Sequence, residues 1–224
     1  MNSMFDGYNR IHFDIGANLG KWPIHFARHE PKTFVVAFEP TPELAQHIAN
    51  ETSNLKNFLI VKNAVSDYNG PATFNVAADD VWGCSSLLEF SDKVKTHWPK
   101  VRRDLKTTHT INVDVIRLDR FIMEYNVPKI DYLKIDTQGC DLNVLKGCGE
   151  FLSLVKEGTM EAAAIDDVLY KGQNTKDESI KFLNEVGFEI IGFEDNDPHG
   201  NEVNIYFRNP NPREIKFNKV WNYQ

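Results

Sequence analysis

Short apolar runs alternate with amphipathic segments over the first part of the chain. The run at 34–38 is apolar at every position, which is typical of a strand buried on both faces. The pair Thr41-Pro42 favours a helix start, because threonine caps helices and proline fits their first turn. This part is expected to hold strands at 11–14, 34–38 and 58–61 and helices at 21–29 and 41–50. That order predicts a parallel sheet with crossover helices.

The middle of the chain, about 66–116, interrupts this alternation. Residues 72–76 are predicted as an extra strand, whereas 79–110 is polar and irregular. A stretch of that length without periodicity is typical of a functional loop or lid. No Ser/Gly-rich linker divides the chain, so we expect a single domain. Its predicted parts are a core at about 11–207, an inserted loop or lid at about 79–110 and an extended tail at 209–224 within the domain 1–224.

The alternation of strands and helices returns in the last half of the chain. It predicts strands at 111–116, 130–135 and 159–165 and helices at 120–125, 142–147 and 176–186. Two further apolar segments, 188–193 and 203–207, flank a polar turn and are predicted as an antiparallel pair. The fold class expected from these patterns is α/β, a mostly parallel sheet that ends in an antiparallel C-terminal strand pair.

Composition and charge narrow the class of protein. The 224 residues are 42% apolar and 25% charged, which is ordinary for a globular chain. With 25 basic and 32 acidic side chains the net charge is −7, so a nucleic-acid partner held by phosphate contacts is not expected. Three cysteines without a C-x-x-C pair encode neither a disulfide framework nor a zinc ribbon. No secretory signal or membrane-spanning run is visible, so we expect a cytoplasmic protein without membrane contact.

The segment Asp14-Ile15-Gly16-Ala17-Asn18-Leu19-Gly20 links the first strand to the first helix. Glycines at this place let backbone N–H groups approach a ligand. A pyrophosphate-binding loop would carry glycine where Asp14 stands, and a carboxylate there repels a diphosphate. The acid instead suits a ligand with a cationic group and no phosphate. The alternative is a tight turn in which Asp14 caps the helix.

Two later positions extend this nucleotide hypothesis. Glu39 ends the second strand, where a carboxylate can accept both hydrogen bonds of a ribose diol. Asn63 and Ala64 follow the third strand, where adenine would lie, although Asn63 could equally satisfy a turn. A ribose, a cation and no phosphate together describe S-adenosylmethionine better than NAD. The same Asp14 disfavours an NAD-dependent dehydrogenase.

Several motifs together carry a family resemblance: residues 14–20, Phe38-Glu39-Pro40, Asn63-Ala64-Val65-Ser66-Asp67, Ser85-Ser86-Leu87 and 131–136. Over about residues 11–207 the chain resembles the FkbM family of S-adenosylmethionine-dependent methyltransferases. The resemblance implies a Rossmann-like class I domain with a seven-stranded sheet, and O-methylation of a sugar, glycan or small natural product. Ser85 and Ser86 would then face the acceptor, although serines in loops usually serve turns. A homodimer is left open.

One departure from the family pattern concerns catalysis. The usual Asp-x-Glu-Gly-x-Glu reads Asp136-Thr137-Gln138-Gly139-Cys140-Asp141 here, and Gln138 can act neither as a base nor as a strong metal ligand. Removing a hydroxyl proton needs a base or a metal ion. We therefore predict Asp136 as the catalytic carboxylate, working as base or as ligand to one divalent ion, with Glu161 as helper. Asp136 could instead cap a turn. A divalent metal ion is left open but not predicted, and a cofactor-binding protein without activity is the alternative function.

Overall fold

The computed structural model describes residues 3–78, 83–95 and 105–217. Within them, a seven-stranded sheet has the order β3-β2-β1-β7-β8-β10-β9 and a three-stranded sheet the order β4-β6-β5. The strands are β1 (Arg10–Ile15), β2 (Thr33–Phe38), β3 (Phe58–Val61), β4 (Ala64–Val65), β5 (Gly70–Ala77), β6 (Thr107–Ile116), β7 (Ile130–Ile135), β8 (Val155–Ala163), β9 (Glu189–Asp195) and β10 (Glu202–Arg208). The α-helices are α1 (Lys21–His29), α2 (Pro42–Glu51), α3 (Leu118–Tyr125), α4 (Asp141–Gly147) and α5 (Lys176–Glu185), and 3₁₀ turns occupy η2 (Asp92–Lys95) and η3 (Gly149–Leu154).

The large sheet confirms the predicted fold class. Strands β3, β2, β1, β7 and β8 pair in parallel, whereas β10 runs antiparallel to both β8 and β9. Parallel neighbours need crossover connections, and the helices between successive strands provide them. Alternate residues of β1 face opposite sides of the sheet, so Phe13 packs with Phe121 of α3 while His12 contacts Trp22 of α1. Both faces of the central strands are therefore covered, as the apolar run at 34–38 requires.

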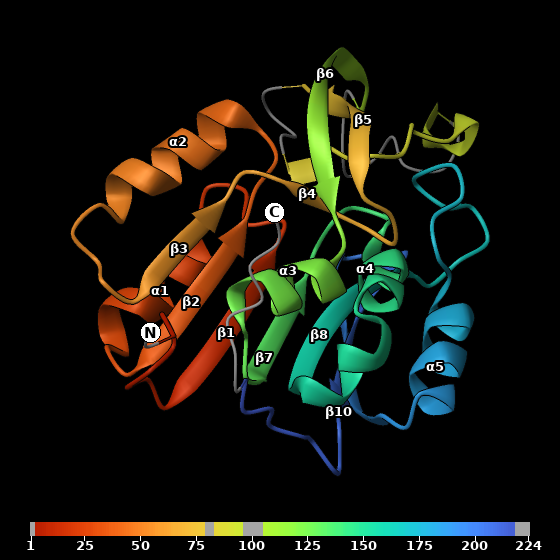
Figure 1. The fold of residues 1–224 in the computed structure, drawn as a ribbon. Coiled ribbons are helices and arrows are strands. Elements are labelled where there is room, and N and C mark those ends of the chain that lie inside the picture. Colours follow the sequence, from red (N-terminus) through yellow and green to blue (C-terminus); the bar gives the residue numbers. More distant parts are fainter. Residues whose placement is uncertain (1–2, 79–82, 96–104, 218–224) are drawn as a thin grey trace.

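The extra strands of the middle region form a sheet of their own. β5 pairs antiparallel with β6, and the short β4 pairs in parallel with β6. β6 begins at Thr107, whereas the predicted strand begins at 111. The first residues of β6 are polar and exposed, so their hydrophobic pattern does not indicate a strand. Of the expected lid at 79–110, residues 79–82 and 96–104 lie outside the described part. In Figure 1 this small sheet stands beyond the carboxyl ends of the main strands.

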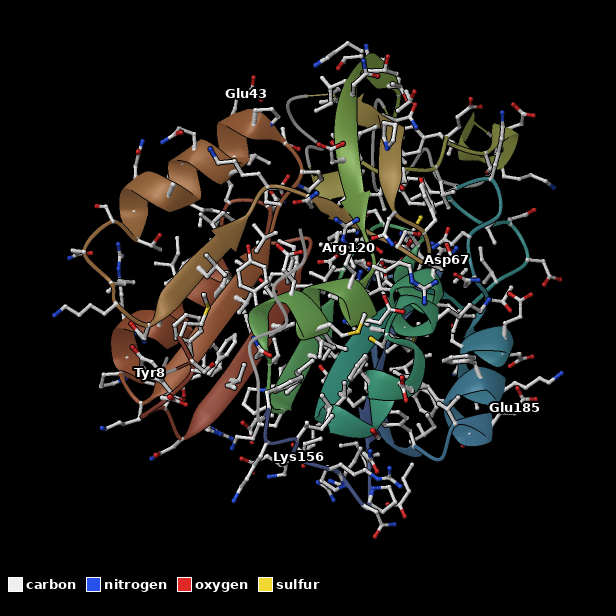
Figure 2. All side chains as sticks on the ribbon, in the orientation of Figure 1. Tyr8, Glu43, Asp67, Arg120, Lys156 and Glu185 are labelled. Carbon is white, nitrogen blue, oxygen red and sulfur yellow. The ribbon has the colours of Figure 1, made fainter. Side chains whose placement is uncertain are left out.

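The helices pack their apolar side chains against the sheet, and charged side chains lie on the surface. In Figure 1, α3 and α4 lie in front of β7 and β8, and their apolar side chains join the main core. Figure 2 shows charged side chains such as Glu43, Lys156 and Glu185 pointing away from the body of the protein. In the tail, Ile215 donates its N–H to the Pro128 carbonyl and packs against the core. No helix among the described residues has the length and apolar character needed to cross a membrane.

Candidate functional site

A pocket lies where the carboxyl ends of β1, β2 and β7 meet the three-stranded sheet. It is lined by residues from the loops after these strands and from the small sheet, which is the usual place of ligand sites in open parallel sheets. Two of the described lining residues, Glu39 and Asp136, are acidic, and none of those residues is Lys, Arg or His. Such a wall attracts a cation and repels phosphate. The predicted residues that line the pocket are Gly16, Asn18, Glu39, Asn63, Ala64, Ser85 and Asp136.

The glycines of the first loop allow close packing of the chain. Gly16 has φ +83°, and a Cβ there would lie 1.9 Å from the backbone oxygen of Asp136. Gly20 has φ +72°, and its Cβ would lie 2.8 Å from side-chain atoms of Ile24 and Ile48. Only glycine fits both the left-handed conformation and these contacts. Ala17 is buried with the same apolar cluster as Ile24, and neither it nor Gly20 lines the pocket, so ligand contact by these two stays a prediction.

Glu39 is held at the pocket wall by two backbone donors. The N–H groups of Asn18 and Thr41 each donate to its carboxylate at 2.8 Å. Burial raises the pKa of Glu39, and these hydrogen bonds oppose the rise. Each carboxylate oxygen keeps a second lone pair for a ribose hydroxyl. The Oδ1 atom of Asn18 is buried without a partner among the described residues, which fits a ligand that donates a hydrogen bond there.

Asn63 and Ala64 form the part of the pocket beside the small sheet. The Asn63 amide nitrogen donates to the backbone oxygen of Asp114 at 3.2 Å, which ties the end of β3 to β6. Its amide oxygen remains for a ligand edge. Both the turn role and the ligand role considered from sequence are therefore compatible with this side chain.

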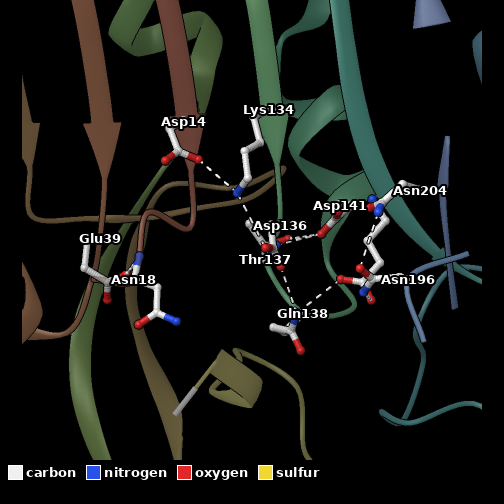
Figure 3. A network of polar contacts seen from close by, with 11 residues as sticks. Asp14, Asn18, Glu39, Lys134, Asp136, Thr137, Gln138, Asp141, Asn196 and Asn204 are labelled. Atoms are coloured by element: carbon white, nitrogen blue, oxygen red, sulfur yellow. Dashed lines mark hydrogen bonds and ion pairs between the residues drawn. The ribbon is translucent and has the colours of Figure 1, made fainter. Parts of the chain in front are cut away.

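Asp14 does not line the pocket but forms an ion pair that the sequence analysis missed. Lys134 Nζ lies 3.1 Å from Asp14 Oδ1 and 3.5 Å from Asp136 Oδ2, so the lysine sits between the two acids (Figure 3). Burial raises the pKa of Asp14 to about 6 although Lys134 opposes the rise. Burial lowers the pKa of Lys134, but the two carboxylates outweigh it and raise the pKa overall. The detectable signal was a lysine inside a predicted buried strand, since a buried cation needs an acidic partner.

Gln138 connects the two predicted catalytic acids. Its amide nitrogen donates to Asp136 Oδ1 at 2.8 Å and to Glu161 Oε2 at 3.2 Å. Glu161 is buried, does not line the pocket and accepts a second hydrogen bond from Asn196 at 2.7 Å. Burial and the neighbouring Glu202 carboxyl raise the pKa of Glu161 well above its ordinary value. Asp136, with 42% of its side chain exposed, is the acid of this pair that faces the pocket.

Asp141 supports this arrangement from the start of α4. Its carboxylate accepts the backbone N–H and the hydroxyl of Thr137 at 2.8 and 2.6 Å, and the N–H of Glu161 at 2.7 Å. Burial raises the pKa of Asp141 to about 6. The side chain therefore joins the loop after β7 to β8 and contacts the site through Thr137 and Glu161.

The two predicted acceptor serines differ in position. Ser85 lines the pocket, and its hydroxyl accepts the N–H of Ala77 at 3.0 Å. Ser86 is fully buried; its hydroxyl donates to the Gln138 carbonyl at 2.6 Å and accepts the N–H of Leu88 at 3.0 Å. Both hydrogen-bonding directions of Ser86 are thus used inside the protein. Ser86 therefore has a structural role in its loop, which was the alternative considered for both serines. Contact of Ser85 with the acceptor stays a prediction.

The chain is similar in sequence and in fold to known methyltransferases. The family model described as the methyltransferase FkbM domain matches residues 14–190. The 2-O-methyltransferase NoeI of Sinorhizobium fredii is 26% identical over 211 residues, covering 92% of this chain and 82% of that protein. The methyltransferase sdnD of Sordaria araneosa is 28% identical over 159 residues, covering 61% of this chain and 60% of that protein. The structure of Aeropyrum pernix fibrillarin with S-adenosyl-L-methionine is 14% identical, covers 92% of this chain and 68% of that chain, and has a TM-score of 0.49.

The family match spans the loop after β1, the acid after β2 and the segment after β7 that together build the pocket. The donors and acceptors of that pocket also fit a ribose-bearing ligand with a positive charge. The chain therefore belongs to the FkbM family of S-adenosylmethionine-dependent methyltransferases.

Proposed function

We propose that the protein methylates a hydroxyl oxygen of a sugar, glycan or other small natural product, with Asp136 as the general base. The observation that carries the proposal is the Asp136 carboxylate, which is half-exposed at the wall of a pocket that also presents Glu39. The printed activity of NoeI, 2-O-methylation, supports an oxygen acceptor. The absence of cationic side chains among the described lining residues favours a small or carbohydrate acceptor over a nucleic acid.

S-Adenosylmethionine, when bound, supplies a methyl carbon on a positively charged sulfur that an oxygen nucleophile can displace in line. Glu39 would accept the ribose hydroxyls, and Asn18 Oδ1 would accept a donor of the same ligand. The residues of the loop after β1 therefore hold and orient the donor. Alignment of the reacting atoms supplies much of the catalysis in such displacements.

Asp136 supplies the chemical help that an alcohol needs. An aliphatic hydroxyl is a weak nucleophile, so its proton must move to a base as the new bond forms. The Gln138 amide donates to Oδ1 of Asp136 at 2.8 Å, and Lys134 lies 3.5 Å from Oδ2. Both contacts orient the carboxylate at the pocket wall. The longer contact at Oδ2 leaves that oxygen room to receive the acceptor's proton.

The test separates cofactor binding from methyl transfer. We expect S-adenosylhomocysteine, and not NAD, to raise the melting temperature and to bind in calorimetry. Radiolabelled S-adenosylmethionine should transfer its methyl group to a hydroxyl acceptor, with the O-methyl group identified by NMR of the product. Asp136→Asn should lower the rate of methyl transfer by a factor of about 10²–10⁴, with the affinity for S-adenosylhomocysteine nearly unchanged.

Three results would count against the proposal. Tight NAD binding without binding of the adenosyl ligands would exclude the donor. Donor binding without turnover across a panel of sugars and small alcohols would favour the alternative of a binding protein. Wild-type turnover in Asp136→Asn would remove Asp136 as base and leave it as a turn residue.

A further inference from the structure

We propose that Gln138 is a positioning residue of the acceptor site, and that its side-chain NH₂ group does between Asp136 and Glu161 what a divalent cation would otherwise do. The inference rests on the proposed role of Asp136 as base. It concerns how this chain holds two acids together and orients the one that faces the pocket.

The orientation of the Gln138 amide follows from its neighbours. One end of the amide lies 2.8 Å from Asp136 Oδ1 and 3.2 Å from Glu161 Oε2, and the other lies 2.8 Å from the Tyr170 hydroxyl. Carboxylate oxygens accept hydrogen bonds, whereas a phenol can donate one. The two carboxyl groups therefore place the NH₂ group at their end of the amide, and the carbonyl oxygen faces the Tyr170 hydroxyl. That hydroxyl also lies 2.8 Å from the Cys84 backbone oxygen, so its one proton is shared between two acceptors. With this assignment both amide protons have partners.

The backbone of Gln138 is held in place as firmly as its side chain. Its φ is +56°, a left-handed conformation that is unfavourable for a residue with a side chain. The buried Ser86 hydroxyl donates to its carbonyl at 2.6 Å, and Tyr170 is buried against Phe90. Segments from three parts of the chain thus converge on one residue. A strained conformation held by so many contacts is typical of a functional position.

A hydrogen-bond donor between the two carboxyl groups reduces their electrostatic repulsion. Asp136 and Glu161 both contact the same nitrogen, so their nearest oxygens lie close to each other. Unscreened carboxylates at such separations repel, and proteins relieve the repulsion with a proton, a donor group or a metal ion. Here the amide provides two donors and no charge. Among the described residues no cluster of three or more His, Cys, Asp or Glu side chains is arranged to hold a metal ion.

The isosteric substitution Gln138→Glu tests this assignment directly. It replaces the NH₂ donor by oxygen and places three carboxyl groups around one point, which is the oxygen-rich donor set that Mg²⁺ and Mn²⁺ prefer. Using Mn²⁺ as the probe, measured by calorimetry and by loss of the free-ion EPR signal, we expect wild type to bind weakly. Gln138→Glu should bind at least about 100-fold more tightly, and adding Glu161→Gln should abolish the gain. Gln46→Glu, the same change on the exposed side of α2, is the matched control and should gain nothing comparable.

A second variant covers the case in which Gln138→Glu does not fold. Gln138→Met keeps the length of the side chain but lacks both donors and any charge. For Gln138→Met we expect a 10–100-fold fall in kcat. The KM for the acceptor and the affinity for S-adenosylhomocysteine should stay within about threefold of wild type. Activity of wild type should be unaffected by a chelator, whereas Gln138→Glu should be inactive with chelator and regain activity with Mg²⁺.

Several outcomes would overturn the inference. One is Mn²⁺ binding by wild type that is as tight as in Gln138→Glu and is lost in Asp136→Asn. Another is a folded Gln138→Glu protein without any gain in Mn²⁺ affinity, and a third is Gln138→Met with wild-type kcat. The Mn²⁺ measurements need no turnover, so failure to find a hydroxyl acceptor would count against the proposed function and leave this inference separately testable.

Discussion

Replacing Gly16 by alanine tests how the ends of the two central strands are brought together. The added Cβ would lie 1.9 Å from the backbone oxygen of Asp136, and φ at this position is +83°. A backbone atom cannot swing aside as the end of a flexible side chain can. The carboxyl ends of β1 and β7 must therefore separate, and the hydrogen bond from Asp136 N–H to the Ile15 carbonyl, 2.9 Å long, is lost.

The expected loss of stability can be estimated from three contributions. Alanine in the left-handed region costs about 1–2 kcal/mol, overpacking about 1–3 kcal/mol and the lost hydrogen bond about 1 kcal/mol. Gly16→Ala should therefore lower the free energy of unfolding by about 3–6 kcal/mol. For a chain of this size, each kcal/mol shifts the melting temperature by about 2–4 °C. A fall of roughly 6–24 °C is expected in a thermal unfolding curve followed by circular dichroism.

A second glycine separates the steric effect from the backbone effect. Gly187 has φ +88° but nothing lies within 4 Å of a Cβ built there. Gly187→Ala should therefore cost only the conformational part, about 1–2 kcal/mol. Urea unfolding of both variants without ligand gives the comparison. Equal losses of stability in the two variants would refute the contact between Gly16 and the Asp136 backbone as the reason for glycine in this loop.

Three further substitutions probe the buried polar groups. His12→Leu removes ring nitrogens that lack partners among the described residues, so it should raise the free energy of unfolding by about 1 kcal/mol at pH 7. Because burial lowers the pKa of His12 from 6.5 to about 4, wild type loses stability as the pH falls through that range, and the gain in His12→Leu should grow; urea titrations at several pH values check this. Asp14 has the opposite sign: its folded-state pKa of about 6 lies above the unfolded value, so its ionisation costs stability as the pH rises from about 4 to 6. Asp14→Asn should remove about 2–3 kcal/mol of this loss of stability between pH 4 and 6 in the same titrations. An unchanged pH dependence would assign the loss to other groups. Glu39→Ala should weaken S-adenosylhomocysteine binding more than tenfold in calorimetry, since a charged acceptor worth about 1.5–3 kcal/mol is lost; an unchanged dissociation constant would place the ribose elsewhere.

The succession of strands and helices along the chain was largely predictable from local sequence. A strand buried on both faces must be apolar along its length, and 34–38 satisfies this without reference to the rest of the chain. The polar ends of these strands were recognisable for the same reason, because each follows directly on an apolar run. Asp14, Glu39 and Asp136 were therefore placed correctly at the carboxyl edge of the sheet.

Strand pairing in the middle of the chain was not predictable in this way. The segments 72–76 and 111–116 have strand patterns, but a pattern does not name the partner strand. The structure pairs them with each other in a separate sheet, and this pairing extends β6 back to Thr107 through polar residues. Backbone hydrogen bonds between the strands stabilise these polar positions, and such bonds cannot be recognised from the hydrophobic pattern of the sequence.

The contacts within the site were likewise decided by the tertiary structure. Register places Asp14 beside Lys134, so a carboxylate expected to face a ligand is paired with an internal cation. The folding of the loop after β7 puts Gln138 between Asp136 and Glu161, and leaves Glu161 behind the pocket wall. Residue type and strand order along the chain determine which groups reach one edge of the sheet. Which of them touch depends on register and loop conformation, because these contacts join residues that are far apart in sequence.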